Sequence, residues 1–149
     1  MIDGDITMTE SAGISQYLVD CYGPTDLGLK PGDKDYSIYL NWLHRSDATL
    51  TFPQTLVLRY TRLEPEERRI PQVAEDYQRW FLSRLRCVEE ALSDRNYLCA
   101  SRFTIADICI GYALVLAESL GLSNSFKAST KRYYSMLKER PAFRRAAEL

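Results

Sequence analysis

The chain has 149 residues, with 19 basic and 20 acidic side chains and a formal net charge of −1. This length suits one domain with a sizeable core, and the balanced charge argues against binding to nucleic acid or to an anionic membrane surface. The four cysteines form no C-x-x-C pair and no signal peptide follows Met1, so we expect reduced thiols and a cytoplasmic location.

The first eight residues carry a hairpin pattern. Asp3-Gly4 is a common tight-turn pair, and Ile6 and Met8 share one face of the short strand that we expect to follow it. The strand before the turn is very short. The alternative is therefore a frayed N-terminus in which Asp3-Gly4 has no structural role.

Apolar residues recur at helical spacing between residues 9 and 23, and Gly23 suits the position just after the end of a helix. The first turn of this helix contains Glu10 and Ser11. Backbone N–H groups at a helix start bind anions, and Glu10 adds an acceptor for an ammonium group. The pattern matches a ligand that carries both charges, such as the α-amino acid end of a molecule. Alternatively, Thr9 or Ser11 merely caps the helix.

Residues 24–32 contain two prolines and two glycines, which predicts a linker. Helical spacing begins at Asp33, and we expect a kink or break at 50–53 because proline cannot continue a helix undistorted. A charged connection at 63–69 leads to an amphipathic helix that begins near Pro71. The predicted inward face of this helix consists of Val73, Tyr77, Trp80, Phe81, Leu85, Val88 and Leu92.

A second helix start lies later in the chain, where Thr104 and Asp107 have the spacing of a capping box. Residues 108–117 carry no charge, which predicts a helix surrounded by other helices, and the run is too short to cross a bilayer. Gly121 closes this helix. Two further helices are expected, the last beginning at Pro141, and no strand pattern follows the N-terminal segment.

Several of these segments, in this order, resemble the cytosolic glutathione S-transferases. The matching segments are Thr9-Glu10-Ser11-Ala12-Gly13-Ile14 with Tyr17-Leu18 and Tyr22-Gly23, Asn41-Trp42-Leu43-His44, Tyr97-Leu98 with Phe103-Thr104-Ile105-Ala106-Asp107-Ile108, and Arg140-Pro141-Ala142-Phe143. Members of this family have a thioredoxin-like α/β half, which binds glutathione, and an all-α half built around a buried helix. The resemblance implies a mainly α fold. Residues 1–23 would be the remnant of the thioredoxin-like domain, with the end of a β-hairpin and one helix, 24–32 the linker, and 33–149 the helical bundle.

The resemblance also implies glutathione as the ligand. Ser11 would bind the carboxylate of its γ-glutamyl end and Glu10 the ammonium group. Tyr39, Trp42 and His44 would lie on the helix that lines the pocket for the electrophile. A lone histidine on a helix is, however, more often a surface or packing residue than a functional one.

Thr104 and Asp107 would have a structural role, and no metal is implied. The Tyr, Ser or Cys that stabilises the glutathione thiolate in this family lies upstream of Met1 in the pattern, so no residue of this chain is assigned to catalysis. In its full-length form the protein would be a homodimer that transfers glutathione to a small hydrophobic electrophile. From these 149 residues alone we expect little or no transferase activity.

Two other functions fit the pattern. The first is a non-catalytic, transferase-like module for dimerisation or scaffolding, although a pure scaffold has no chemical need for Glu10 and Ser11. The second is an all-α protein that binds hydrophobic small molecules between the apolar helix face at 36–43 and the uncharged helix that contains residues 108–117. An apolar side of the first helix would also be exposed, so we expect self-association.

Overall fold

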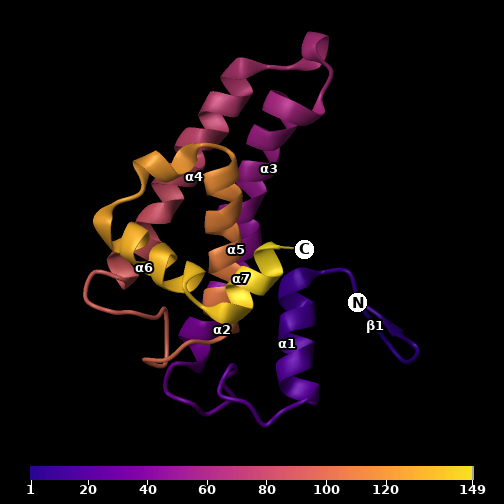
Figure 1. Ribbon diagram of the computed structural model, residues 1–149, viewed down its shortest axis with the longest axis vertical. Coiled ribbons are helices and arrows are strands. Elements are labelled where there is room, and N and C mark those ends of the chain that lie inside the picture. Colours follow the sequence, from indigo (N-terminus) through magenta and orange to yellow (C-terminus); the bar gives the residue numbers. More distant parts are fainter. Residues whose placement is uncertain (149) are drawn as a thin grey trace.

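The computed structural model describes residues 1–148 and is mainly helical, with one two-stranded antiparallel sheet, as the sequence predicts (Figure 1). The strands are β1 (Ile2–Asp3) and β2 (Ile6–Thr7). The α-helices are α1 (Ser11–Cys21), α2 (Tyr36–Arg45), α3 (Phe52–Leu58), α4 (Pro71–Ala91), α5 (Ile105–Ser119), α6 (Ala128–Lys138) and α7 (Pro141–Ala147). Two π-helical turns, η1 (Ser46–Thr51) and η2 (Arg59–Leu63), flank α3, and two 3-10 turns, η3 (Glu66–Arg68) and η4 (Leu122–Ser125), precede α4 and α6.

The N-terminal hairpin is formed and is tied to α1, so the alternative of a frayed N-terminus is wrong. Ile2 pairs with Thr7 across the two strands, and Gly4 adopts a positive φ of 56° in the turn. The Asp3 carboxylate accepts hydrogen bonds from the hydroxyls of Tyr17, at 2.8 Å, and of Tyr22. These bonds lower the pKa of Asp3 and anchor the hairpin on the side of α1 that faces away from the bundle (Figure 1).

The linker after α1 is held by Arg102, which precedes α5, and by Ile105, the first residue of α5. Arg102 donates from Nε to the Asp26 carbonyl at 2.8 Å and from Nη2 to the Gly28 carbonyl at 3.0 Å. Between them, the Ile105 N–H, which has no acceptor inside its own helix, donates to the Leu27 carbonyl at 2.8 Å. Three consecutive linker carbonyls are therefore fixed, which positions α1 against α5.

The segment from α2 to η2 is one continuous helical rod, so the expected distortion near Pro53 is a change of helix type and not a break. In η1 the backbone widens, and the Phe52 N–H donates to the carbonyl of Asp47, five residues earlier. This wider turn accommodates Pro53, which has no N–H to donate. The fully buried Gln54 then links the rod to α5, because its Nε2 donates to the carbonyls of Leu50 and Ala113, both at 3.0 Å.

Helix α4 lies beside α3 (Figure 1) and presents the predicted apolar face, with one correction. Phe81, Leu85 and Val88 are buried, whereas Trp80 is 44% exposed. Trp80 stacks on Tyr77 with ring centroids 5.3 Å apart, and Tyr77 contacts Phe52 edge to face. Trp80 therefore belongs to an aromatic cluster at the surface, because its position lies at the edge of the helix face that reaches the core.

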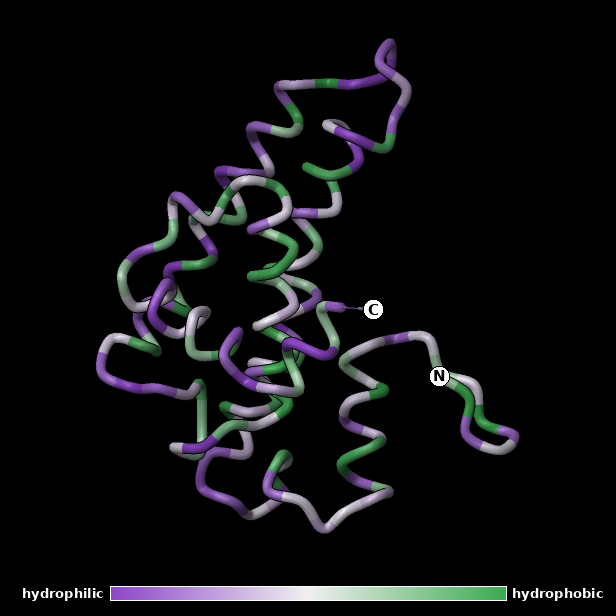
Figure 2. The backbone as a smooth tube through the Cα atoms, viewed as in Figure 1, coloured by the Kyte–Doolittle hydropathy of each residue, from purple (hydrophilic) through white to green (hydrophobic). Residues whose placement is uncertain are grey.

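Helix α5 forms the centre of the core, but the prediction that other helices surround it is wrong on one side. Nine of its residues are buried, and apolar positions gather along it and along the helices that face it (Figure 2). Ile108, Tyr112 and Val115 are nevertheless 44%, 56% and 37% exposed. Their spacing places them on one stripe of the helix. The absence of charge at residues 108–117 therefore correctly predicted an apolar helix. It wrongly predicted that neighbouring helices cover this helix on every side.

Across residues 1–148, no helix combines the length and the hydropathy that a membrane span requires.

We expect the protein to become less stable at alkaline pH, because three of its tyrosines are buried. Burial raises the pKa of Tyr39, Tyr133 and Tyr134 above the ordinary value of 10.0. Above that pH the unfolded chain loses protons that the folded chain keeps, so the free energy of unfolding falls as the pH rises. We expect the ultraviolet absorbance of these phenolates to appear together with the loss of helical circular dichroism. Complete tyrosine ionisation before any loss of helix would contradict this expectation, and a Tyr133→Phe variant should remove one phenolate from the coupled step.

Candidate functional site

The start of α1 has the arrangement that the sequence predicts. Glu10 is the N-cap residue, with φ −84° and ψ 118°, and Ser11 is the first helical residue. The first bond within the helix runs from the Ile14 N–H to the Glu10 carbonyl at 2.8 Å. The N–H groups of Ser11, Ala12 and Gly13 precede that bond and point out of the helix end. They form the positive end of the helix dipole.

The side chains at this helix end are free to meet a ligand. Both Glu10 and Ser11 are exposed, and the Glu10 side chain makes no capping hydrogen bond. Thr9 and Ser11 are not the N-cap residue, so the alternative that one of them simply caps the helix is wrong. An anionic group could accept from the N–H groups and the Ser11 hydroxyl, while the Glu10 carboxylate could accept from an ammonium group beside it.

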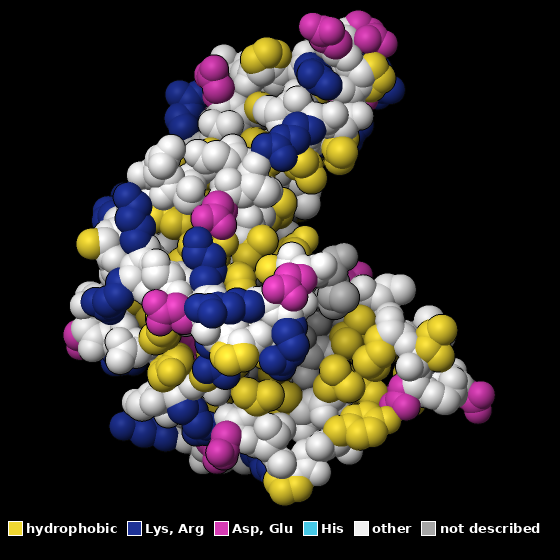
Figure 3. All heavy atoms as spheres, in the orientation of Figure 1, with side chains coloured by type: hydrophobic (Ala, Val, Ile, Leu, Met, Phe, Trp, Pro, Cys, Tyr) yellow, Lys and Arg dark blue, Asp and Glu magenta, His cyan; other side chains and the backbone are white. Residues whose placement is uncertain are grey.

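The surface around this helix end is shaped by apolar groups. Met8 lies against the first turn, because its Cε is 3.7 Å from the position that a Cβ on Gly13 would occupy. Figure 3 shows the surface hollowed between the N-terminal end of α1 and the tip formed by α3 and α4, with hydrophobic side chains on its walls.

The structure separates the three residues predicted for the electrophile pocket. Tyr39 and Trp42, three residues apart, share the buried face of α2 and are 1% and 4% exposed. Burial also raises the pKa of Tyr39. His44 is exposed and lies two residues beyond Trp42, so it faces away from that buried side. The three side chains do not meet at one surface, and their contact with an electrophile stays a prediction.

The capping box at the start of α5 is confirmed, and it has more partners than the sequence indicates. The Thr104 N–H donates to Asp107 Oδ2 at 2.8 Å. Asp107 Oδ1 accepts from the Leu98 N–H at 3.2 Å and from the Tyr133 hydroxyl at 2.8 Å. Burial raises the pKa of Asp107, against the effect of these hydrogen bonds. The carboxylate thus joins the loop before α5, the start of α5 and α6.

The sequence did not predict the hydrogen bonds of Tyr133 with Asp107, of Gln54 with Ala113 or of Tyr17 and Tyr22 with Asp3. Each of these hydrogen bonds joins residues that are far apart in the sequence, and no local sequence pattern predicts it. Among residues 1–148, no group of three or more His, Cys, Asp or Glu side chains is placed to hold a metal ion.

Comparison with known proteins finds similar proteins among the glutathione S-transferases. No protein-family model matches the chain. It is 27% identical over 161 residues to glutathione S-transferase 3 of Schizosaccharomyces pombe, a match that covers 99% of the chain and 65% of that protein. The chain thus spans about two thirds of the length of this relative.

Solved structures of glutathione transferases also superpose on this chain. Ure2p5 of Phanerochaete chrysosporium, crystallised with 1-(S-glutathionyl)-2,4-dinitrobenzene, is 28% identical, with a TM-score of 0.85 over 97% of this chain and 69% of that one. A glutathione transferase homologue of Lodderomyces elongisporus, which holds two glutathione molecules per subunit, superposes with a TM-score of 0.86 over 99% of this chain and 70% of that one. At 20% identity, the second match supports the fold alone.

Proposed function

We propose that this chain, which is related in sequence and fold to the glutathione S-transferases over nearly its whole length, binds the γ-glutamyl end of glutathione at the start of α1. The observation that carries the proposal is the exposed pair Glu10 and Ser11 at a helix end whose N–H groups have no acceptor within the helix. Ser11 and the neighbouring N–H groups bind the carboxylate, and Glu10 binds the ammonium group.

We propose that the rest of the ligand lies in the hollow beside α1. With its γ-glutamyl end at the helix start, glutathione extends its thiol toward the apolar walls of the hollow (Figure 3). A small hydrophobic electrophile is the co-substrate that such walls suit. Of the three α2 residues, only His44 is exposed, and Tyr39 and Trp42 lie in the core. Contact of His44 with the electrophile is proposed on the family resemblance alone, because Figure 3 shows no histidine on the face that carries the hollow.

The chemistry proposed for the complete protein is the attack of the glutathione thiolate on an electrophilic carbon. A free thiol has a pKa of about 8.5, so a nearby donor or positive charge must favour the thiolate at neutral pH. We assign that role to no residue of this chain, and we expect little or no turnover by these 149 residues alone. We also propose that the protein is a cytoplasmic homodimer. Its glutathione-binding part is residues 1–23, its linker is residues 24–32 and its helical domain is residues 33–149.

The test is retention of the chain on immobilised glutathione, followed by elution with free glutathione. We expect the wild-type chain to be retained, and the Ser11→Ala and Glu10→Gln variants to bind roughly tenfold more weakly, because each loses a hydrogen bond to a charged group. Ser37→Ala, at another exposed serine, and Asp20→Asn, at an exposed acid near the opposite end of α1, should bind like the wild type. Equal retention of all five proteins would contradict the proposal.

A scaffold function is the second candidate, and one observation favours it. The surface cluster of Phe52, Tyr77 and Trp80, together with the exposed stripe on α5, offers apolar area that suits association with another protein or a second copy. The same experiment separates the two functions, because a scaffold without a glutathione site would pass through the column unretained.

A further inference from the structure

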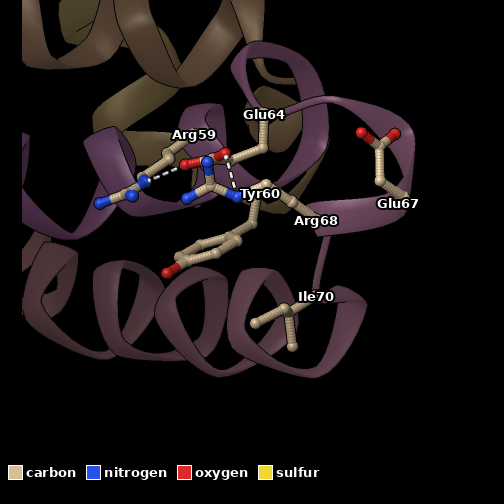
Figure 4. A pocket seen from close by; sticks show the side chains of 6 residues that line it. All are labelled: Arg59, Tyr60, Glu64, Glu67, Arg68 and Ile70. Carbon is tan, nitrogen blue, oxygen red and sulfur yellow. Dashed lines mark hydrogen bonds and ion pairs between the residues drawn. The ribbon is translucent and has the colours of Figure 1, made fainter.

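A pocket far from α1 in the sequence gathers arginines at the tip between α3 and α4. It has a volume of about 270 Å³ and is lined by Arg59, Tyr60, Glu64, Glu67, Arg68 and Ile70 (Figure 4). All six residues come from the segment that joins α3 to α4, outside the elements that position the glutathione site. Nothing in the proposed function uses them.

One nearly buried carboxylate organises this pocket. The Glu64 side chain is 11% exposed, and its oxygens contact Arg59 Nε at 2.7 Å and Arg68 Nε at 3.3 Å. Arg69 also donates from Nε to the Glu64 carbonyl at 3.0 Å. Arg59, Glu64 and Arg68 together thus carry a local charge of +1, and Glu67, at the other end of the pocket, makes the whole lining formally neutral. Because the Glu64 carboxylate holds both guanidinium groups, little side-chain entropy remains to be lost when an anion binds them.

The N–H and O–H donors of the pocket that do not bind Glu64 point toward one side of it. Both contacts with Glu64 use Nε, whereas most N–H donors of a guanidinium are on the two terminal nitrogens. In Figure 4 the terminal nitrogens of Arg59 and Arg68 and the hydroxyl of Tyr60 extend to one side of the pocket. The Glu67 carboxylate lies at the other end, directed away from them. The arrangement therefore presents donors on three groups and keeps the second acid apart.

We propose that this pocket binds the phosphate group of a small organic phosphate monoester. A phosphate dianion accepts hydrogen bonds on three oxygens, which matches two guanidinium ends and one phenol. The local charge of +1 at the Arg59–Glu64–Arg68 group favours an anion at the unused donors, while Glu67 lies at the other end of the pocket (Figure 4). Ile70, which is 45% exposed, and the Tyr60 ring, against which the Arg59 guanidinium lies at 5.3 Å, provide apolar surface for the carbon group of the ester. The inference stands whether or not the chain binds glutathione.

The test is calorimetric titration of the chain with phenyl phosphate at low ionic strength, repeated with inorganic phosphate. We expect saturable binding of phenyl phosphate, and weaker binding of inorganic phosphate because it lacks the apolar group. Arg59→Gln and Arg68→Gln should each weaken binding of phenyl phosphate at least fivefold. Tyr60→Phe, which removes only a hydroxyl, should weaken it about threefold, and added salt should weaken it in the wild type.

The matched control is Arg79→Gln. Arg79 is an exposed arginine of α4 that also pairs with an acid, Asp76, at 2.6 Å, but it lies outside the pocket. Binding by this variant should equal that of the wild type. Absence of saturable binding in the wild type, or equal weakening by Arg79→Gln and by the two pocket variants, would overturn the proposal and leave Glu64 as a structural tie for the α3–α4 connection.

Discussion

Asp107→Ala is expected to lower the free energy of unfolding by about 4 kcal/mol. The Asp107 carboxylate is fully buried and accepts from the Thr104 N–H, the Leu98 N–H and the Tyr133 hydroxyl. The Thr104 hydroxyl also donates to Asp107 Oδ2, at 3.3 Å. Alanine would leave these donors without that partner in buried surroundings, and each such group costs about 1–3 kcal/mol. Urea unfolding followed by circular dichroism measures the change.

Asp76→Ala is the control for this substitution. Asp76 also accepts hydrogen bonds, from Arg79 at 2.6 Å and from Gln72 at 3.1 Å, but its side chain is 54% exposed. Water replaces these partners, so the change should stay within about 0.5 kcal/mol. A loss below about 1 kcal/mol in Asp107→Ala would show that the capping box does not organise the fold.

Ile110→Ala is expected to lower the free energy of unfolding by about 3 kcal/mol. The Ile110 side chain is fully buried in α5, and its truncation removes buried methyl groups and leaves a cavity that the packed helices close only in part. The same urea experiment measures the loss, and the dependence of the free energy on urea should keep its slope.

The control is on the same helix, two residues earlier. Ile108 is 44% exposed, so Ile108→Ala should cost less than about 1 kcal/mol. Helix propensity changes in the same direction in both variants, and the difference between them therefore reports burial. Equal losses in the two variants would mean that the exposed stripe on α5 is covered in solution.

Much of the fold could be predicted because its signals are local. The Thr104 and Asp107 spacing, the turn at Gly4 and the apolar face of α4 depend on residues close in sequence, and the structure contains all three. The kink expected at Pro53 followed from the missing N–H of proline. That the chain would respond with a π-helical turn depends on how α2 and η1 pack on α5 and how α3 packs on α4, which periodicity does not encode.

The candidate site was predictable in part for the same reason. Glu10 and Ser11 were recognised because a helix start has a local signature, and the structure places them there. The grouping of Tyr39, Trp42 and His44 came from family resemblance, but helical spacing alone separates His44 from Trp42 by more than half a turn. The arginine pocket was missed because the charged segment at 63–69 was interpreted as a connection, and its two-to-one pairing on Glu64 is visible only in three dimensions.

Amide chemical-shift mapping by NMR tests the central claim, that the start of α1 binds the γ-glutamyl end of glutathione. The dipeptides γ-glutamylcysteine and cysteinylglycine each keep one half of the ligand. The account predicts that glutathione and γ-glutamylcysteine shift the amides of Ser11, Ala12 and Gly13 most strongly and to saturation, and that cysteinylglycine leaves them unchanged. Saturable shifts that avoid these three amides, or equal shifts with both dipeptides, would contradict it.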